Sequence, residues 1–260
     1  MKVRLETDTA ESPSAVSAHA RIRSIWIHSL HWPAPNARAD VVLVHGLGVA
    51  SRMCAPLGRL LSERSRVWAP DLPGFGMSPH TGVLGVEEHA DLLAAWVEAN
   101  RLRSPTIVGT SFGCQVVAAA AERHPDACRA VVLGAPIVQA DRRTWRQQLA
   151  RWPRERQSMQ LQRLIVEDFA RAGLPRVIRT FSAALHDRIE DRVARLSQPL
   201  LVCWGTRDPL MTRAWVAELA GRARDGRLAV LPGARHALSH DSPLPFARAI
   251  THFADQNGGL

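Results

Sequence analysis

The stretch IVGTSFGCQVVAAA, residues 107–120, decides how the chain is expected to fold. An apolar run leads into Gly109, Ser111 stands between two glycines, and a helix-forming run follows Gly113. A pattern G-x-S-x-G arises by chance in a chain of 260 residues with a probability of roughly one in twenty. The residues around it must therefore decide whether Ser111 is a nucleophile or a small residue in a tight turn.

Apolar runs and helical patterns alternate on both sides of this stretch. Continuous runs at 39–46, 65–74, 105–110, 128–136, 198–206 and 226–234 predict buried strands, and 21–30 predicts an edge strand. Residues 53–64, 85–100, 111–125, 213–223 and 242–256 predict helices. Strands that alternate with helices form a mostly parallel sheet with helices on both faces. The sequence predicts an α/β core over residues 1–136 and 197–260, with residues 1–18 as a poorly ordered lead-in.

The alternation of strand and helix patterns stops over residues 137–196, where no strand pattern occurs. Apolar residues recur there at helical spacing, and this predicts an all-helical insertion that lies over the strand ends as a cap. Six of its apolar residues are candidates to line a pocket or to pack within the cap: Trp145, Trp152, Leu161, Leu164, Phe169 and Phe181. Thirteen arginines and seven acidic residues lie between Asp141 and Arg195, which favours either an anionic substrate or a solvated helix surface.

The composition is that of an ordinary globular protein, with 46% hydrophobic and 22% charged residues. The net charge of +9 comes from dispersed arginines, and no basic run or nucleic-acid motif occurs, so we expect no nucleic-acid partner. We expect four buried free cysteines, no metal and no cofactor. No apolar run is long enough to span a membrane and no secretory signal is evident, so we expect a cytoplasmic location.

Four loops follow predicted strands and carry polar residues that suit acyl transfer. They are VHGLG (44–48), DLPGFGMS (71–78), the G-T-S-F-G turn, and WGTRDPL (204–210), after which the chain reaches His236. In parallel sheets the chemistry lies at the carboxyl ends of the strands, where these loops begin.

With these motifs in this order, the chain resembles the α/β-hydrolase superfamily over roughly residues 20–256. The helical insertion stands where that family carries its cap, after strand 6. The order Ser111, Asp208, His236 is the family's order of nucleophile, acid and histidine. The resemblance implies a serine hydrolase of the esterase-like branch that acts through an acyl-enzyme.

The expected roles follow from the chemistry. A serine hydroxyl is a weak nucleophile until a base removes its proton, so His236 is the expected base and Asp208 holds its tautomer. By resemblance, the backbone N–H groups of Leu47 and Phe112 form the oxyanion hole. His45, Gly46 and Gly48 are expected to support that loop.

Each assignment has an alternative. His240 is a second candidate base, Asp141 a second candidate acid, and the pair His236 and His240 is weakly similar to a metal site. We expect Asp71 and Ser78 to tie a loop, and three histidines to be surface or packing residues: His28, His31 and His124.

The expected substrate is a carboxylic ester or a related acyl compound, largely apolar. A carbon–carbon hydrolase of diketone-like substrates and a cofactor-free perhydrolase of the haloperoxidase type use the same residues and stay open. A small-molecule receptor on the same fold is the alternative that is not an enzyme. Chain length, stereochemistry and oligomeric state stay open as well.

Overall fold

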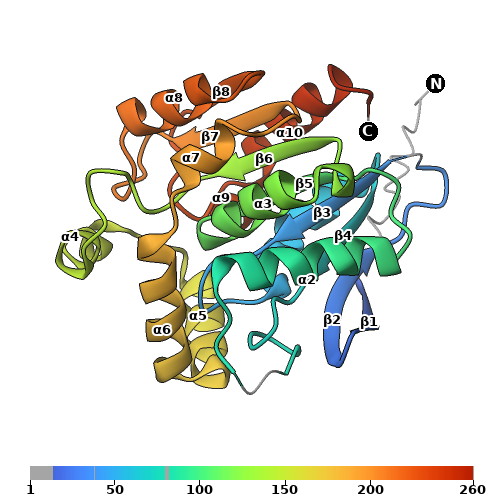
Figure 1. Cartoon of the computed structure of the whole chain (residues 1–260), viewed down its shortest axis with the longest axis horizontal. Coiled ribbons are helices and arrows are strands. Elements are labelled where there is room, and N and C mark those ends of the chain that lie inside the picture. The colour runs from blue at the N-terminus through green and yellow to red at the C-terminus, as the bar shows by residue number, and fades with distance from the viewer. Residues whose placement is uncertain (1–13, 38, 80–81, 260) are drawn as a thin grey trace, which may run out of the picture.

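The computed structural model describes residues 14–37, 39–79 and 82–259, and its strands form one eight-stranded sheet (Figure 1). The strand order is β1-β2-β4-β3-β5-β6-β7-β8. β1 and β2 pair antiparallel, as do β2 and β4, and all other neighbours are parallel. The strands are β1 (Val16–Ile22), β2 (Ile25–Trp32), β3 (Asp40–Val44), β4 (Arg66–Pro70), β5 (Thr106–Thr110), β6 (Ala130–Gly134), β7 (Leu200–Gly205) and β8 (Gly226–Leu231). The predicted fold class is confirmed.

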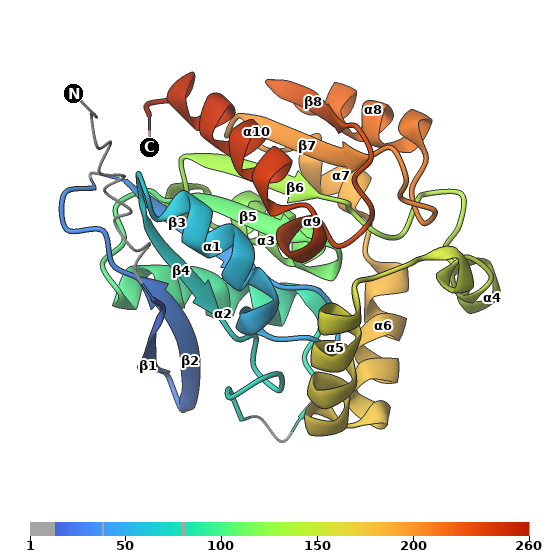
Figure 2. The same ribbon diagram turned by 180° about the vertical axis from the view of Figure 1, so that it is seen from behind.

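Helices cover both faces of the sheet (Figure 1, Figure 2). One face carries α1 (Ala55–Leu61), α9 (Leu238–Asp241) and α10 (Pro243–Asp255), and the other carries α2 (Val86–Ala99), α3 (Phe112–Arg123) and α8 (Arg213–Arg222). Short 3₁₀ turns, η1 (Ser51–Cys54) and η2 (Pro125–Ala127), precede α1 and follow α3. On β3, Val41 and Leu43 belong to one apolar cluster while Val42 and Val44 belong to the other. Successive side chains on a strand point to opposite faces, so the unbroken apolar run of this strand reflects two cores.

The N-terminal part of the sheet differs from the prediction. The edge strand expected at 21–30 is a hairpin in which β1 and β2 meet through a tight turn, with Arg23 at φ 56°. The predicted lead-in reaches residue 18, but β1 begins at Val16, and residues 1–13 lie outside the described part of the chain. β1 was missed because most of its side chains are exposed or half-exposed, so the strand needs no apolar alternation.

The segment predicted as a cap, residues 137–196, contains helices and no strand among its residues, all of which the structure describes. Its elements are α4 (Trp145–Leu149), η3 (Trp152–Arg154), α5 (Met159–Ala172), α6 (Leu174–His186) and α7 (Ile189–Val193). α5 and α6 lie side by side at one end of the sheet (Figure 2), and the chain turns between them at Gly173, φ 79°. α7 packs instead against α3 and α8. We keep the name cap segment for residues 137–196.

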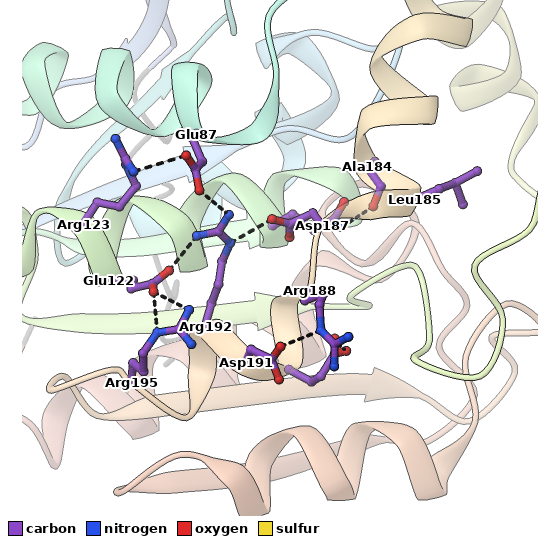
Figure 3. Close-up of polar contacts among 12 residues, drawn as sticks. Glu87, Glu122, Arg123, Ala184, Leu185, Asp187, Arg188, Asp191, Arg192 and Arg195 are labelled. Atoms are coloured by element: carbon purple, nitrogen blue, oxygen red, sulfur yellow. Dashed lines mark hydrogen bonds and ion pairs between the residues drawn. The ribbon is translucent and has the colours of Figure 1, made fainter.

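Ion pairs attach the C-terminal end of the cap segment to the core (Figure 3). The guanidinium group of Arg192, 12% exposed, pairs with Glu122 at 2.6 Å, Asp187 at 2.8 Å and Glu87 at 3.0 Å. Glu87 lies in the first turn of α2 and Glu122 near the end of α3, so one arginine of α7 joins two core helices. Arg143, on the entering segment, pairs with Glu190 at 2.6 Å, and this contact ties the two ends of the cap segment together.

A second ion-pair cluster joins α5 to η1 of the core. Arg52 in η1 pairs with Asp168 and Glu167, each at 2.7 Å, and donates to the Leu164 carbonyl at 3.1 Å. The Asp168 side chain is 1% exposed, so Arg52 supplies the cation that this buried carboxylate requires. Phe169, the next residue of α5, places its ring against Gly48: a Cβ added to Gly48 would lie 2.3 Å from that ring.

Candidate active site

Ser111 lies at the turn between β5 and α3 and has a backbone conformation that side chains rarely adopt, with φ 57° and ψ −119°. The turn is held on both sides: the Ser111 N–H donates to the Gly134 carbonyl, and the Ser111 carbonyl accepts from Cys114 N–H, both at 3.0 Å. A strained residue persists where its surroundings fix it, and such residues cluster at functional sites. The Ser111 side chain is half-buried and lines an apolar cavity.

The glycines of the G-T-S-F-G turn allow two close backbone approaches. A Cβ on Gly109 would lie 2.4 Å from the Gly113 carbonyl oxygen, and a Cβ on Gly113 would lie 2.4 Å from the Val44 carbonyl oxygen. Real Cβ atoms do not approach that closely, so both positions require glycine. The sequence pattern therefore reflects the packing of β5, α3 and the end of β3.

The structure brings Ser111, His236 and Asp208 together in one hydrogen-bonded line. His236 Nε2 lies 3.0 Å from Ser111 Oγ, and His236 Nδ1 lies 2.9 Å from Asp208 Oδ2. The Asp208 side chain is fully buried, and its Oδ1 accepts the N–H groups of Leu210 at 2.7 Å and Met211 at 3.3 Å. With the carboxylate fixed in this way, Nδ1–H donates to it and Nε2 is free to accept from the serine hydroxyl.

Asp208 and His236 lie 28 positions apart in the chain, but they follow the neighbouring strands β7 and β8 and therefore meet. The loop after β8 returns against the end of β7: Arg207 N–H donates to the Ala234 carbonyl at 2.9 Å. A Cβ on Gly205 would lie 2.4 Å from that same carbonyl oxygen, so the approach needs glycine. Ser239 Oγ, 2.8 Å from Thr110 Oγ1, then holds the histidine loop against the end of β5.

The electrostatic environment makes His236 a stronger base. Burial lowers the pKa of His236, but the charge of Asp208, its hydrogen bond and the charge of Glu155 together raise that pKa above its ordinary value. The raised pKa means that the imidazolium ion is stabilised when the histidine takes up a proton. This is the property required of a base that accepts a proton from serine.

The expected oxyanion loop lies beside Ser111. Leu47 and Gly46 line the cavity, and a Cβ on Gly46 would lie 3.3 Å from Ser111 Cβ. Phe112 is the first residue of α3, so its N–H is among those that have no acceptor within their own helix. His45 Nε2 accepts from the Leu72 N–H at 2.9 Å, which leaves Nδ1–H to donate to the Gly46 carbonyl at 2.8 Å. Burial lowers the pKa of His45, so it holds this loop as a neutral imidazole.

The loop at 71–78 is tied internally, as expected for Asp71 and Ser78. Asp71 lies 2.7 Å from His28 Nδ1 and accepts the N–H groups of Ser51 at 2.7 Å and Met77 at 2.8 Å. Ser78 Oγ accepts the His28 N–H at 2.9 Å. Burial raises the pKa of Asp71, but these hydrogen bonds and the nearby histidines lower it overall. Asp71 and its partners therefore position η1 and β2 rather than a substrate.

The alternative residues lie elsewhere. His240 Nδ1 is 2.8 Å from the neighbouring Asp241, and the Asp141 carboxylate is 68% exposed and pairs with Arg142. His31 stacks on Trp68 with 3.7 Å between ring centroids, and His124 pairs with Asp91 at 2.7 Å. The structure therefore places Asp208 and His236, and neither alternative, beside Ser111.

A cavity of about 460 Å³ lies between the core loops and the cap segment. Five of the six predicted apolar cap residues line it: Trp145, Trp152, Leu161, Phe169 and Phe181. Leu164, the sixth, does not, and it is its carbonyl that Arg52 binds. No arginine is among the described residues that line the cavity, so the arginines of the cap segment face other surroundings.

Sequence reasoning missed Glu155, which also lines the cavity. Glu155 follows η3, where Trp152 packs edge-on against the His236 ring with 6.1 Å between ring centroids. The segment from Glu155 to Gln157 has no helical or strand pattern, so no periodic signal marked it. Its position depends on how the cap segment packs onto the core.

Over the described ranges, no three His, Cys, Asp or Glu side chains are grouped so that they could hold a metal ion. Within the same ranges no helix is both long and apolar enough to cross a bilayer. All four cysteines are buried and unpaired, and burial raises the pKa of the Cys54 and Cys128 thiols to about 12.

Comparison with known proteins agrees with this geometry. A family model for the alpha/beta hydrolase fold matches residues 41–161. The chain has the α/β-hydrolase fold. A pimeloyl-[acyl-carrier protein] methyl ester esterase from Neisseria meningitidis serogroup B is 28% identical to this chain. That alignment covers 87% of this chain and 96% of the relative.

Two solved structures share the fold. The enol-lactonase from Burkholderia xenovorans LB400 has a TM-score of 0.76 at 22% identity, over 91% of this chain and 99% of that chain. A membrane phospholipase A, described as a bacterial virulence factor, has a TM-score of 0.79 at 19% identity, over 93% and 86%. The α/β-hydrolase fold expected from the sequence motifs is therefore confirmed.

Proposed function

We propose that this α/β-hydrolase cleaves carboxylic esters with Ser111 as nucleophile, His236 as base and Asp208 as the acid that orients it. The observation that carries the proposal is the hydrogen-bonded line, with distances of 3.0 Å and 2.9 Å, whose Ser111 and His236 line an apolar cavity. The enzyme class, a carboxylic ester hydrolase, follows from the family and from esterase relatives that align over 96% of their length.

The reaction takes two half-steps. Ser111 Oγ attacks the ester carbonyl carbon while His236 Nε2 takes the hydroxyl proton, and the N–H groups of Leu47 and Phe112 stabilise the negative oxygen. The carbon–oxygen bond to the alcohol then breaks, and His236 gives its proton to the leaving alcohol. In the second half-step His236 removes a proton from water, which attacks the acyl carbon. The bond to Ser111 Oγ then breaks, His236 returns the proton to that oxygen, and the acid is released.

The cavity supports an apolar acyl chain. Its wall is formed mainly by aliphatic and aromatic side chains of the cap segment, and the described residues that line it include no arginine to bind a carboxylate. A cavity of this size suits a medium-length acyl group.

A methyl ester on a carrier-bound acyl group, named for the relatives, is a second candidate substrate. The observation that favours it is the excess of arginines in the cap segment, thirteen against seven acidic residues from Asp141 to Arg195. Arg146, Arg154 and Arg156 are exposed and do not line the cavity, so they would contact a negatively charged carrier outside it while the acyl chain enters. Turnover of free and carrier-bound methyl esters of one acyl chain separates the two candidates.

A fluorophosphonate probe tests the proposal directly. We expect one equivalent of probe on wild type, located by peptide mass spectrometry at Ser111, and none on Ser111→Ala, whose kcat falls on the order of 10⁶-fold. Ser62→Ala is the control, since Ser62 is a buried serine whose hydroxyl donates to the Arg59 carbonyl at the end of α1, and it still labels to completion. Equal labelling of Ser111→Ala would refute the assignment. Full labelling without turnover of an ester panel would favour the carbon–carbon hydrolase.

A further inference from the structure

Glu155 carries the one carboxyl group among the described residues that line the cavity. Both carboxyl oxygens are shielded from solvent, and neither has a hydrogen-bond partner of good geometry within the described part of the chain. The surrounding wall is apolar, with Trp152, Leu161 and Ala237 among its residues. A buried carboxyl group without a partner costs free energy, so its presence beside a catalytic site calls for a function.

The local environment keeps this group between its two protonation states. Burial raises the pKa of Glu155 to about 7, and the charge of Asp208 adds to this effect. The charge of His236, a contact with the His236 backbone N–H and the charge of Arg235 oppose it. The group can therefore accept a hydrogen bond as a carboxylate at little cost once a donor enters the cavity. A donor from the substrate would supply a well-formed hydrogen bond, which the nearby His236 backbone N–H does not.

The position of Glu155 near His236 puts it on the alcohol side of the ester bond that is cleaved. His236 gives its proton to the leaving alcohol, so the alcohol oxygen must lie beside His236 Nε2. The carbonyl oxygen must lie on the other side of Ser111, toward the Leu47 and Phe112 N–H groups. Glu155 interacts electrostatically with His236, and the Trp152 ring three residues earlier packs against it. Glu155 therefore faces the alcohol part of the ester.

We propose that Glu155 binds a hydrogen-bond donor on the alcohol part of the substrate, a hydroxyl group or a protonated amine. This inference rests on the proposed ester hydrolysis and extends it to a substrate class: esters of polyols or amino alcohols with an apolar acyl chain. It separates this chain from the named activity of its relatives, because the alcohol of a methyl ester carries no donor.

Three esters of one acid test the proposal: propyl octanoate, 2-hydroxyethyl octanoate and 2-(dimethylamino)ethyl octanoate. They share the acyl chain and differ in whether the alcohol offers no donor, a hydroxyl donor or a cationic N–H donor. Octanoate release at slightly alkaline pH gives kcat/KM for each ester. For wild type we expect at least one donor ester to exceed the propyl ester by about 10-fold or more.

Variants of Glu155 identify the donor. In Glu155→Leu the ratio of donor to propyl ester falls to about one. Glu155→Gln keeps an acceptor oxygen without charge, so it retains part of a hydroxyl preference and loses an ammonium preference. Glu218→Leu, an exposed carboxylate on α8 paired with Arg222, is the matched control and keeps the wild-type ratio. Glu155→Gln has nearly the same shape as the native residue, so it keeps the test usable if the leucine variant does not fold.

Two results would overturn the inference: equal kcat/KM for all three esters in wild type, or a donor preference that survives in Glu155→Leu. Fluorophosphonate labelling separates either result from failure of the proposed function. A labelled enzyme that hydrolyses the esters without preference keeps the proposed function and loses this inference. An enzyme that neither labels nor turns over any ester loses both.

Discussion

The core loops and the cap segment form the two sides of one cavity, and they are held in different ways. On the core side, backbone hydrogen bonds fix the residues: Asp208 accepts two N–H groups, and His45 is bonded through both ring nitrogens. On the cap side, side chains pack on one another, as in the Trp145 and Phe181 pair with ring centroids 4.7 Å apart. The difference suggests that the core fixes the chemistry and the cap segment fixes the choice of substrate.

The largest effect should come from weakening the core side. Asp208→Asn removes the charge that stabilises the imidazolium and favours the wrong tautomer of His236, so we expect kcat to fall about 10⁴-fold. Phe181→Ala, which opens the cap wall, is the contrasting variant and should change the preferred acyl chain length more than kcat. Steady-state kinetics on esters of increasing chain length measure kcat and the preferred chain length for both variants. A small loss of kcat in Asp208→Asn would contradict the assignment of the chemistry to the core.

The pH profile of kcat/KM should shift in the same variant. In the proposed mechanism the neutral form of His236 is the active base. Activity should therefore rise as pH passes upward through the pKa of His236, which lies above its ordinary value in wild type. Burial, which lowers that pKa, remains in Asp208→Asn, while the charge that raises it is gone. The acidic limb should therefore move to lower pH, although the plateau is lower. A shift of the acidic limb to higher pH in Asp208→Asn would refute the pairing of His236 with Asp208.

Gly48→Ala acts where the two sides touch. Gly48 has φ 75°, and an added Cβ would lie 2.3 Å from the Phe169 ring, so the oxyanion loop or α5 must shift. Misplaced oxyanion donors should lower kcat about 10- to 100-fold. In the double variant Gly48→Ala with Phe169→Ala, removal of the ring should restore part of that loss, and no recovery would mean that backbone strain alone is responsible.

Arg52→Ala should give the smallest effect, because it loosens the cap segment without touching the reacting atoms. Asp168 is left buried without its cation, so we expect a melting temperature lower by several degrees and faster hydrogen exchange in α5. KM should rise more than kcat falls. Arg163→Ala is the control on the same helix, because Arg163 is 84% exposed and pairs with Glu167 alone. Equal effects of Arg52→Ala and Arg163→Ala would show that Arg52 does not hold α5 on the core.

The core side could be read from the sequence because its signals are local. Close backbone approaches at Gly109, Gly113 and Gly205 require glycine, and the order of Ser111, Asp208 and His236 selects side chains that lie within hydrogen-bonding distance. The unbroken apolar strands likewise follow from burial on both faces.

Other features depend on packing between distant segments. Glu155 faces the cavity only because η3 folds back onto His236, and the pairs of Arg52 with Asp168 and His28 with Asp71 join residues 116 and 43 positions apart. β1 has exposed side chains and is defined by its pairing with β2. None of these follows from periodicity, which reports only how one segment is buried.

The acyl-enzyme is the most direct test of the claim that the core loops carry the chemistry. Mixing the enzyme with p-nitrophenyl octanoate in a stopped-flow instrument, followed by acid quench and peptide mass spectrometry, measures both the burst and the modified residue. The account predicts a burst of one p-nitrophenolate per chain and an octanoyl group on Ser111. An octanoyl group on any other residue, or turnover in Ser111→Ala at the wild-type rate, would contradict it.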